Sequence, residues 1–376
     1  MTPEDRAWEV VRRAFEERAS TPSQRSSKHA SNRLLLALVA AGAAAAVAIA
    51  VITPPGHAVL ERVRRAVGIE HAAPRLVALP APGRLLVVSP GRSGVWVVDA
   101  DGLRRRLGNY DDAMWSPHGL YVVATTPTEL LTLEIGRSVR WSLPRRGARS
   151  PRWEGSLTDT RIAYLTPRGD LRVVAGDGTG DHLLARDAGA APPAWDPARL
   201  HTVAYATGSA VVLRNADTRS IVWRAPIAFG PTSLAWSSDG RLLAVVSPTR
   251  VLVLAGDGSV ERTITTPTGT FRGAAFRPRT HELALSVRQR SSSEIKLLSA
   301  GRSEASRVLF AGPGTFGDIV WAPDGSWLLV DWPTADQWVF LRGGRVRAVS
   351  NIEQQFPPTD RRGATLQIAE RWCCAR

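Results

Sequence analysis

The side chains that could do chemistry are spread thinly along this chain. The seven histidines are His29, His57, His71, His118, His182, His201 and His281. His281 and Glu282 begin the His-Glu-x-x-His pattern of a zinc protease, but position 285 is leucine, so the second zinc ligand is missing. The paired carboxylates Asp111 and Asp112 suit a solvated strand entrance better than a catalytic pair. These residues predict no catalytic centre and no metal site.

Other catalytic and cofactor-binding patterns are missing as well. No Gly-x-Ser-x-Gly turn presents a nucleophilic serine. The two lysines, Lys28 and Lys296, lie in no glycine-rich phosphate loop, and aspartates do not alternate as they do in a calcium loop. We therefore expect a protein that is not an enzyme and has no cofactor.

The net charge is strongly positive. Lys and Arg number 48 against 34 Asp and Glu, a formal charge of +14. Such a charge favours anionic partners such as lipid headgroups or an envelope polymer, although a base-rich genome would also enrich arginine. The clusters Arg104–Arg106 and Arg145–Arg146 stand in no basic helix with interleaved aromatic residues. Nucleic acid is therefore the partner that the sequence disfavours.

One segment has the length and composition of a membrane span. Residues Leu34–Thr53 are twenty residues without a charge, a helix of about 30 Å that matches the hydrocarbon core of a bilayer. Pro54 and Pro55 end it. Arg33 abuts the span, which favours a cytoplasmic N-terminus and places the rest of the chain outside. The alternatives are a buried core helix and a signal peptide cleaved after Ala48-Ile49-Ala50.

The N-terminal 19 residues predict a cytoplasmic amphipathic helix. Thr2 and Pro3 suit a helix start. Trp8, Val11 and Phe15 recur on one face, and a helix this short cannot bury them by itself. We expect these three side chains to bind a cytosolic protein partner, the alternative being the inner leaflet of the membrane. Residues 20–33 form a polar, serine-rich linker, and 54–74 a juxtamembrane segment.

A unit of about forty residues then repeats to near the end of the chain. Its clearest copies are Trp236-Ser-Ser-Asp-Gly-Arg-Leu-Leu-Ala-Val and Trp321-Ala-Pro-Asp-Gly. The aromatic position falls at 79, 115, 153, 195, 236, 276 and 321, and the first copy, at Leu79, keeps the turn but lacks the aromatic residue. A period near forty predicts β-propeller blades.

Each unit contains four short strands separated by turn residues. In the fifth unit these are 232–236, 242–247, 250–255 and 259–264, and Asp-Gly recurs between the last two strands, as a tight hairpin requires. We expect an all-β fold, a seven-bladed β-propeller over residues 75–351, with six or eight blades as alternatives. Residues 352–376 form a C-terminal tail.

Several aromatic residues and the two cysteines need their own interpretation. The repeated aromatic residues are expected to pack between blades. They are Trp115, Trp153, Trp195, Trp236, Phe276 and Trp321. Trp327, Trp332 and Trp338 crowd the last unit, and blade packing is favoured there over a ligand-stacking patch. Cys373 and Cys374 lie in a tail too short to fold, which leaves a disordered end or mixed disulfides with another chain.

The Trp-Ser-x-Asp-Gly-Arg-Leu-Leu-Ala-Val run resembles the repeat of TolB-like and WD40-like bacterial propellers. The whole layout resembles uncharacterised membrane-anchored propeller proteins of actinobacteria. A short cytoplasmic helix before one span is also similar in layout to anti-sigma factors, although residues 1–33 lack the His/Cys zinc pattern common in that family.

These resemblances imply a non-catalytic scaffold or sensor outside the cytoplasm. It would be held by a single span in the cell membrane and could relay to a cytosolic regulator through the N-terminal helix. Two alternatives stay open. One is an envelope lyase or hydrolase with its site in the propeller funnel. The other is a TolB-like periplasmic transport component, which would need a cleaved leader.

Overall fold

The computed structural model describes residues 78–89, 94–136, 138–266, 268–301, 306–356 and 367–374. No helix within these ranges has the length and apolar character needed to cross a bilayer. The span predicted at 34–53 lies outside them, together with the helix at 1–19 and the linking segments at 20–33 and 54–74.

The described residues form seven antiparallel four-stranded sheets. Each sheet is one blade, and its strands are given from the innermost to the outermost: blade 1 consists of β28 (Gln367–Cys373), β1 (Arg84–Ser89), β2 (Gly94–Val98) and β3 (Arg104–Gly108), and blade 2 of β4 (Asp112–Trp115), β5 (Tyr121–Thr125), β6 (Glu129–Glu134) and β7 (Val139–Pro144). Blade 3 consists of β8 (Arg149–Trp153), β9 (Arg161–Leu165), β10 (Leu171–Ala175) and β11 (His182–Ala185), blade 4 of β12 (Ala194–Trp195), β13 (Thr202–Ala206), β14 (Ala210–Asn215) and β15 (Ile221–Pro226), and blade 5 of β16 (Ser233–Trp236), β17 (Leu242–Val246), β18 (Arg250–Ala255) and β19 (Val260–Thr265). Blade 6 consists of β20 (Thr270–Phe276), β21 (Glu282–Arg288), β22 (Ser292–Ser299) and β23 (Arg307–Pro313), and blade 7 of β24 (Ile319–Trp321), β25 (Leu328–Trp332), β26 (Gln337–Arg342) and β27 (Arg345–Ser350).

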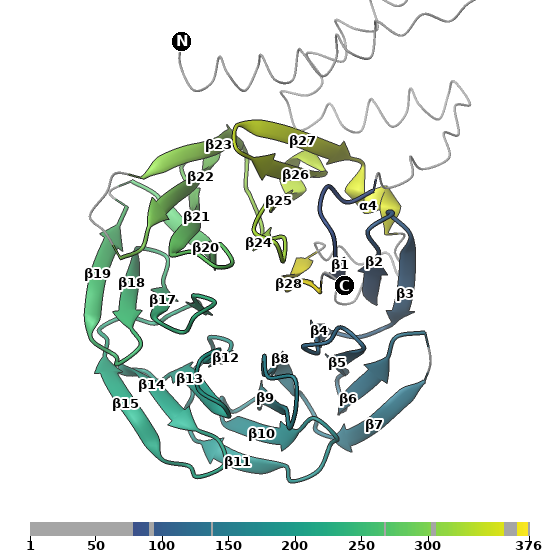
Figure 1. Ribbon diagram of the computed structural model, residues 1–376, viewed down its shortest axis with the longest axis vertical. Coiled ribbons are helices and arrows are strands. Elements are labelled where there is room, and N and C mark those ends of the chain that lie inside the picture. The colour runs from purple at the N-terminus through teal and green to yellow at the C-terminus, as the bar shows by residue number, and fades with distance from the viewer. Residues whose placement is uncertain are drawn as a thin grey trace, which may run out of the picture. The chain divides into compact units, whose positions relative to one another are not determined.

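The seven sheets close into a ring (Figure 1). The first strand of each blade lies toward the centre and the fourth lies at the rim. The predicted seven-bladed propeller is confirmed, and the four strands predicted for the fifth unit match β16–β19 within one residue at every end. The match is close because Asp-Gly and Ser-Pro turns limit each strand locally.

The ring closes through the C-terminus. Strand β28 pairs antiparallel with β1 and touches both β24 of blade 7 and β4 of blade 2. The prediction that residues 352–376 are a tail outside the propeller is therefore wrong for this strand. So is the aromatic position at Leu79, because Trp372 of β28 pairs with Leu85 and holds that position in blade 1. The first unit is split between the two ends of the propeller, which a unit-by-unit reading along the chain does not show.

Packing is organised between blades. The buried apolar residues fall into seven clusters, each formed by two neighbouring blades. In the cluster between blades 7 and 1, the Trp372 and Phe340 rings meet edge to face at 5.9 Å. Ile352 of the short helix α4 (Ile352–Gln355) and the following Phe356 complete this cluster. Each blade thus buries both faces only when its neighbours are present.

The repeated aromatic side chains pack between neighbouring blades, as predicted. In three of them the indole Nε1–H also donates to the backbone carbonyl of the residue before the aromatic position in the preceding blade. These hydrogen bonds are Trp195 to Arg152 (2.8 Å), Trp236 to Ala194 (3.2 Å) and Trp321 to Ala275 (3.1 Å). A large ring with one polar tip fills the gap between two blades and satisfies a backbone acceptor.

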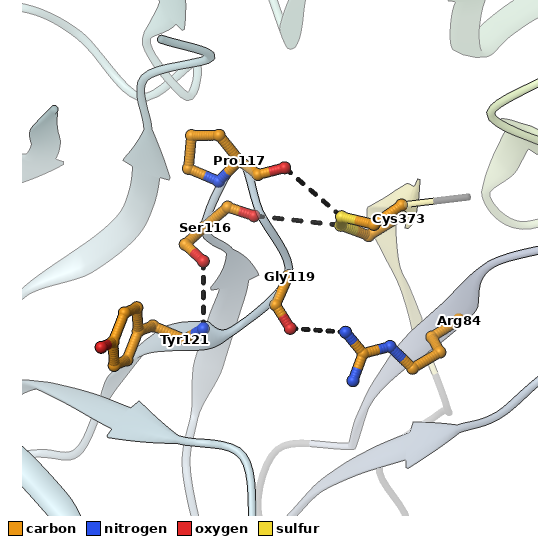
Figure 2. Close-up of a disulfide and its surroundings, with 7 residues drawn as sticks. Arg84, Ser116, Pro117, Gly119, Tyr121 and Cys373 are labelled. Carbon is orange, nitrogen blue, oxygen red and sulfur yellow. Dashed lines mark hydrogen bonds between the residues drawn. A yellow bond between two sulfur atoms is a disulfide. The ribbon is translucent and has the colours of Figure 1, made fainter. Parts of the chain in front are cut away.

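A disulfide joins Cys373 and Cys374 at the point of closure (Figure 2). The Sγ atoms lie 3.9 Å from the carbonyl oxygen of Ser116 and 3.4 Å from that of Pro117, in the first turn of blade 2. Gly119 of that turn has φ +64°, and a Cβ there would come within 2.8 Å of the Cys374 sulfur. In this structure the cysteines pair with each other and the chain end lies against blade 2, so the expectation of a disordered end is wrong for Cys373 and Cys374, whereas a mixed disulfide with another chain stays a prediction.

Candidate functional site

The turns divide the propeller into two faces. In a four-stranded antiparallel sheet, the first and third turns lie at one end and the second turn lies at the other. We call the first of these ends the first-turn face and the other the second-turn face. The first-turn face carries the Trp-x-x-Asp-Gly turns of the repeat, and the second-turn face carries the connections between blades.

A cleft of about 370 Å³ opens on the first-turn face between blades 6 and 7. Its lining comes from the strands β22, β23, β24, β26 and β27, from the first turn of each blade and from the third turn of blade 7. The apolar part consists of Leu297, Leu309, Trp321, Leu341 and Val346. The polar part consists of Arg277, Arg307, Asp324, Ser326, Arg342 and Arg345, with Gly343 and Gly344. An apolar floor with a cationic rim is the arrangement that binds a ligand with an apolar body and anionic groups.

Two charged residues of the rim, Arg277 and Asp324, form hydrogen bonds within the protein. The Arg277 guanidinium stacks 5.3 Å from the Trp321 ring centre, donates to the Gly325 carbonyl at 2.8 Å and pairs with Glu282 at 2.7 Å. Asp324 accepts hydrogen bonds from the Ser326 backbone N–H and hydroxyl. Partial burial opposes ionisation, but these bonds and the Arg342 charge outweigh it and lower the pKa of Asp324.

The other three arginines of the rim face solvent. Arg307, Arg342 and Arg345 are exposed and form no ion pair within the part of the chain that the structure describes. The Arg342 guanidinium lies 5.8 Å from the Trp327 ring centre, which limits its orientation. Asp324 offsets one of these three charges, so the cleft keeps a net positive charge.

A second depression, of about 310 Å³, lies on the second-turn face of blade 3. Its lining comes from the second turn of that blade and the connection to blade 4. It consists of Arg149, Pro167, Arg168, Gly169, Asp187, Gly189 and Ala190. Pro167 and Ala190 are its only apolar side chains, so this depression lacks the floor that the cleft between blades 6 and 7 has.

The structure brings two of the histidines to the junction of blades 3 and 4. His201 Nδ1 lies 2.5 Å from Asp217 Oδ2, and its Nε2 lies 2.6 Å from the Asp159 carbonyl oxygen. His182 Nε2 lies 3.1 Å from the Ala216 carbonyl oxygen. His201 is buried, and both of its ring nitrogens are engaged by the protein. None of these atoms lines either cavity, so the arrangement ties blades together.

Two further histidines, His281 and His118, lie in first turns of other blades. His281 Nε2 is 2.9 Å from Asp239 Oδ2 and connects the first turns of blades 5 and 6. That contact contributes to holding the pKa of Asp239 at about 2, because the hydrogen bonds of Ser237 and His281 outweigh burial. His118 sits in the first turn of blade 2, as predicted, with its Nε2 2.8 Å from the Leu157 carbonyl oxygen. Histidine thus recurs as a link between first turns.

Asp331 is a deeply buried carboxyl whose pKa is raised by its surroundings. It ends the second strand of blade 7 with 5% of its surface exposed, and its backbone N–H donates to the Asp318 carbonyl. Burial, followed by the nearby Asp318 carboxylate and then Asp336, raises its pKa well above the ordinary value. A Cβ at Gly317 would lie 2.6 Å from Asp331 Oδ2, so the carboxyl is closely covered.

We expect Asp331→Asn to stabilise the fold at neutral pH. Between the ordinary aspartate pKa and the raised one, the folded state binds more protons than the unfolded state, so wild-type stability falls as pH rises through that window. The amide removes this fall and should gain about 1–3 kcal/mol at pH 7, because each unit by which the folded-state pKa exceeds the unfolded one costs about 1.4 kcal/mol. Thermal unfolding midpoints from about pH 4 to pH 8 test it. Asp324→Asn, whose wild-type pKa is lowered, is the control and should stabilise at no pH.

The tryptophans of the last unit do not form one stacking patch. Trp338 is fully buried between blades 7 and 1, whereas Trp332 packs edge to face on Phe310 and Phe316 between blades 6 and 7. Blade packing is therefore confirmed for these two residues. Trp8, Val11 and Phe15, the predicted partner-binding residues, lie outside the described ranges. No cluster of three metal-ligating side chains occurs among the described residues.

Comparison with protein-family models and with curated proteins finds no match, whereas comparison with solved structures finds similar folds. No protein-family model and no curated protein matches the chain. The C-terminal WD40 domain of Sif2 is similar in structure, with a TM-score of 0.53 and 12% identity, over 71% of this chain and 83% of that domain. Hydrazine synthase of Kuenenia stuttgartiensis gives a TM-score of 0.49 at 13% identity, over 61% of this chain and 75% of that chain. At these identities the likeness concerns the fold alone, and the chain is a seven-bladed β-propeller.

Proposed function

We propose that this chain is a membrane-anchored binding protein whose propeller serves as a scaffold or sensor outside the cytoplasm and catalyses no reaction. The observation that carries the binding role is the cleft between blades 6 and 7. It combines an apolar floor with three exposed arginines whose charge Asp324 offsets only in part. A closed ring of seven sheets holds such a surface rigidly, and preorganisation lowers the entropic cost of binding.

The membrane-anchoring part of the proposal rests on the sequence. The uncharged run Leu34–Thr53 is long enough to span a bilayer, and Arg33 beside it favours a cytoplasmic N-terminus. The part of the proposal that concerns a relay to a cytosolic partner rests on the apolar face of the helix predicted at 1–19. Trp8, Val11 and Phe15 need a partner to cover them, and a cytosolic regulator that takes the helix in a groove would do so.

The proposal that the chain catalyses no reaction is supported by the contacts of two buried polar residues, His201 and Glu154. His201 and Glu154 contact backbone and side chains of the adjoining blades and line neither cavity. Their geometry accounts for them as connectors between turns. A catalytic acid or base would need to reach a cavity that admits a substrate.

Purification of the full-length chain from its own membranes tests the proposal. With an affinity tag inserted in the polar linker 20–33, the wild type should retain a cytosolic protein. Trp8→Ala/Phe15→Ala should lose it by at least about tenfold, since each aromatic anchor is worth about 1–2 kcal/mol. Arg6→Ala/Arg13→Ala, on the polar face of the same helix, is the matched control and should retain it.

Two outcomes would contradict parts of this proposal separately. Identical sets of cytosolic partners in the wild type and the aromatic double variant would remove the relay. Recovery of the chain in the soluble fraction, with a mass that lacks residues 1–50, would remove the anchor and favour the periplasmic transport alternative.

A further inference from the structure

We propose that the cleft between blades 6 and 7 binds an acidic peptide segment of a protein partner, with one large apolar side chain of that segment seated on the cleft floor. This inference rests on the proposed binding role and specifies the ligand chemistry of that site.

The charge of the rim selects the sign of the ligand. Glu282 neutralises Arg277, and Asp324 offsets one of the three charges of Arg307, Arg342 and Arg345, so the charge left for a ligand is positive. All three are exposed arginines in a single concave surface. Arginine presents a planar fork of donors that matches carboxylate geometry, and three such forks favour several acidic groups over one.

The floor of the cleft selects for more than charge. Leu297, Leu309 and Leu341 lie beneath the arginines, together with Val346 and the edge of Trp321. A free inorganic anion would satisfy the arginines and leave this apolar surface wet. The volume of about 370 Å³ is at the lower end for ligand pockets, which suits a single large side chain entering from a longer molecule.

The edge of blade 6 favours a polypeptide as that longer molecule. Strand β23 is the outermost strand of its sheet and pairs only with β22, so one row of its backbone groups is free of sheet pairing. Arg307 and Leu309 of this strand line the cleft. An extended peptide lying along β23 could pair with that free edge, point one apolar side chain to the floor and keep its carboxylates at the rim.

Binding of a labelled acidic peptide to the full-length chain in detergent tests the proposal. The probe is a fluorescein-labelled octapeptide with one leucine near its middle and with glutamate and aspartate on both sides of it. Fluorescence anisotropy measures its binding. Arg307→Glu/Arg342→Glu/Arg345→Glu should weaken its binding by at least about thirtyfold, the loss expected when several charge-assisted contacts become repulsive.

The control variant changes the same charge elsewhere. Arg140→Glu/Arg168→Glu/Arg224→Glu substitutes three exposed arginines of blades 2, 3 and 4 that do not line the cleft, and binding should stay within about twofold. A peptide with glycine in place of the central leucine should bind the wild type about tenfold more weakly, because it leaves the floor uncovered. Because all six arginines are exposed, both triple variants should keep the wild-type unfolding midpoint.

Three outcomes would overturn the proposal. Equal weakening by both triple variants would show that only net charge matters. Equal binding of the leucine and glycine peptides would show that the floor is not used. Competition by tripolyphosphate at the same concentration as the peptide would make the cleft a simple anion site. If the cleft variant still retains the partners that wild type purifies from membranes, the scaffold role stands and only this assignment of its site fails.

Discussion

Removal of residues 367–376 should leave a chain that no longer unfolds in one sharp thermal transition. The deletion removes strand β28, which is the innermost strand of blade 1 and the contact between blades 7 and 2. Without it, β1 presents an unpaired edge and the cluster between blades 7 and 1 loses Trp372. In a ring each blade depends on both neighbours, so the loss spreads beyond one sheet.

A single substitution gives the same prediction in graded form. Trp372 is 4% exposed and meets the Phe340 ring at 5.9 Å, so Trp372→Ala should cost about 3–5 kcal/mol, a large part of the stability of a typical domain. Leu200→Ala, at a side chain that is 58% exposed, is the control and should change stability by less than about 0.5 kcal/mol. Chemical denaturation followed by circular dichroism measures both.

The contrary results are equally definite. A truncated chain with the wild-type midpoint and slope would show that the ring does not need β28. A cost of Trp372→Ala no larger than that of Leu200→Ala would show that Trp372 does not fill the interface between the first and last blades.

The sequence contained a signal for this closure that the unit-by-unit alignment missed. The first copy of the repeat, Gly83-Arg84-Leu85-Leu86, has the second half of the pattern and lacks the aromatic residue before it. Arg371-Trp372-Cys373-Cys374 has the first half, with two cysteines where the fifth unit has Ser237-Ser238. A first unit that lacks its aromatic residue and an aromatic residue near the C-terminus, Trp372, together predict a blade built from both ends of the propeller. What local pattern cannot supply is the pairing of strands nearly three hundred residues apart.

The strands and the sites differ in how far sequence could predict them. Strand ends depend on nearby turn residues, which is why the fifth blade was predicted within one residue. The cleft needs Arg277 and Arg307 from one blade and Arg342 and Arg345 from the next, and nothing in their spacing marks them as neighbours. They come together only because first and third turns share a face and adjacent blades lie side by side.

The link between blades 3 and 4 shows how repeat positions can be used for such predictions. Glu154 follows the repeated Trp of blade 3, where blades 2 and 5 have Ser116 and Ser237. The serine side chains accept a backbone N–H within their own turn, from Tyr121 and Leu242. A longer side chain with two acceptors at the same position reaches the next blade as well. Glu154 thus makes a contact with the next blade that the serines at this position in blades 2 and 5 do not make.

Glu154→Ala should accordingly destabilise the propeller by about 2–5 kcal/mol. Oε1 of Glu154 accepts the backbone N–H of His201 at 2.5 Å, and Oε2 accepts that of Arg161 at 3.1 Å, while 2% of the residue is exposed. Burial raises the pKa of Glu154, with the hydrogen bonds from His201 and Arg161 opposing it. Alanine leaves two donors without an acceptor, at about 1–3 kcal/mol each.

The repeat supplies the matched control for this substitution. Ser237→Ala removes the equivalent acceptor in blade 5, where Ser237 bonds within its own turn, accepting from the Leu242 N–H and donating to Asp239, so it should cost about 1–2 kcal/mol. Chemical denaturation of both variants gives the comparison, and the difference between them measures the link to His201. Because His201 has φ of 52°, a left-handed conformation that the Glu154 contact helps to hold, the alanine variant should also loosen the first turn of blade 4. Faster amide exchange of the Asp196–His201 turn in Glu154→Ala, and not in Ser237→Ala, is the expected signature. Equal costs and equal exchange in the two variants would show that Glu154 acts within its own turn alone.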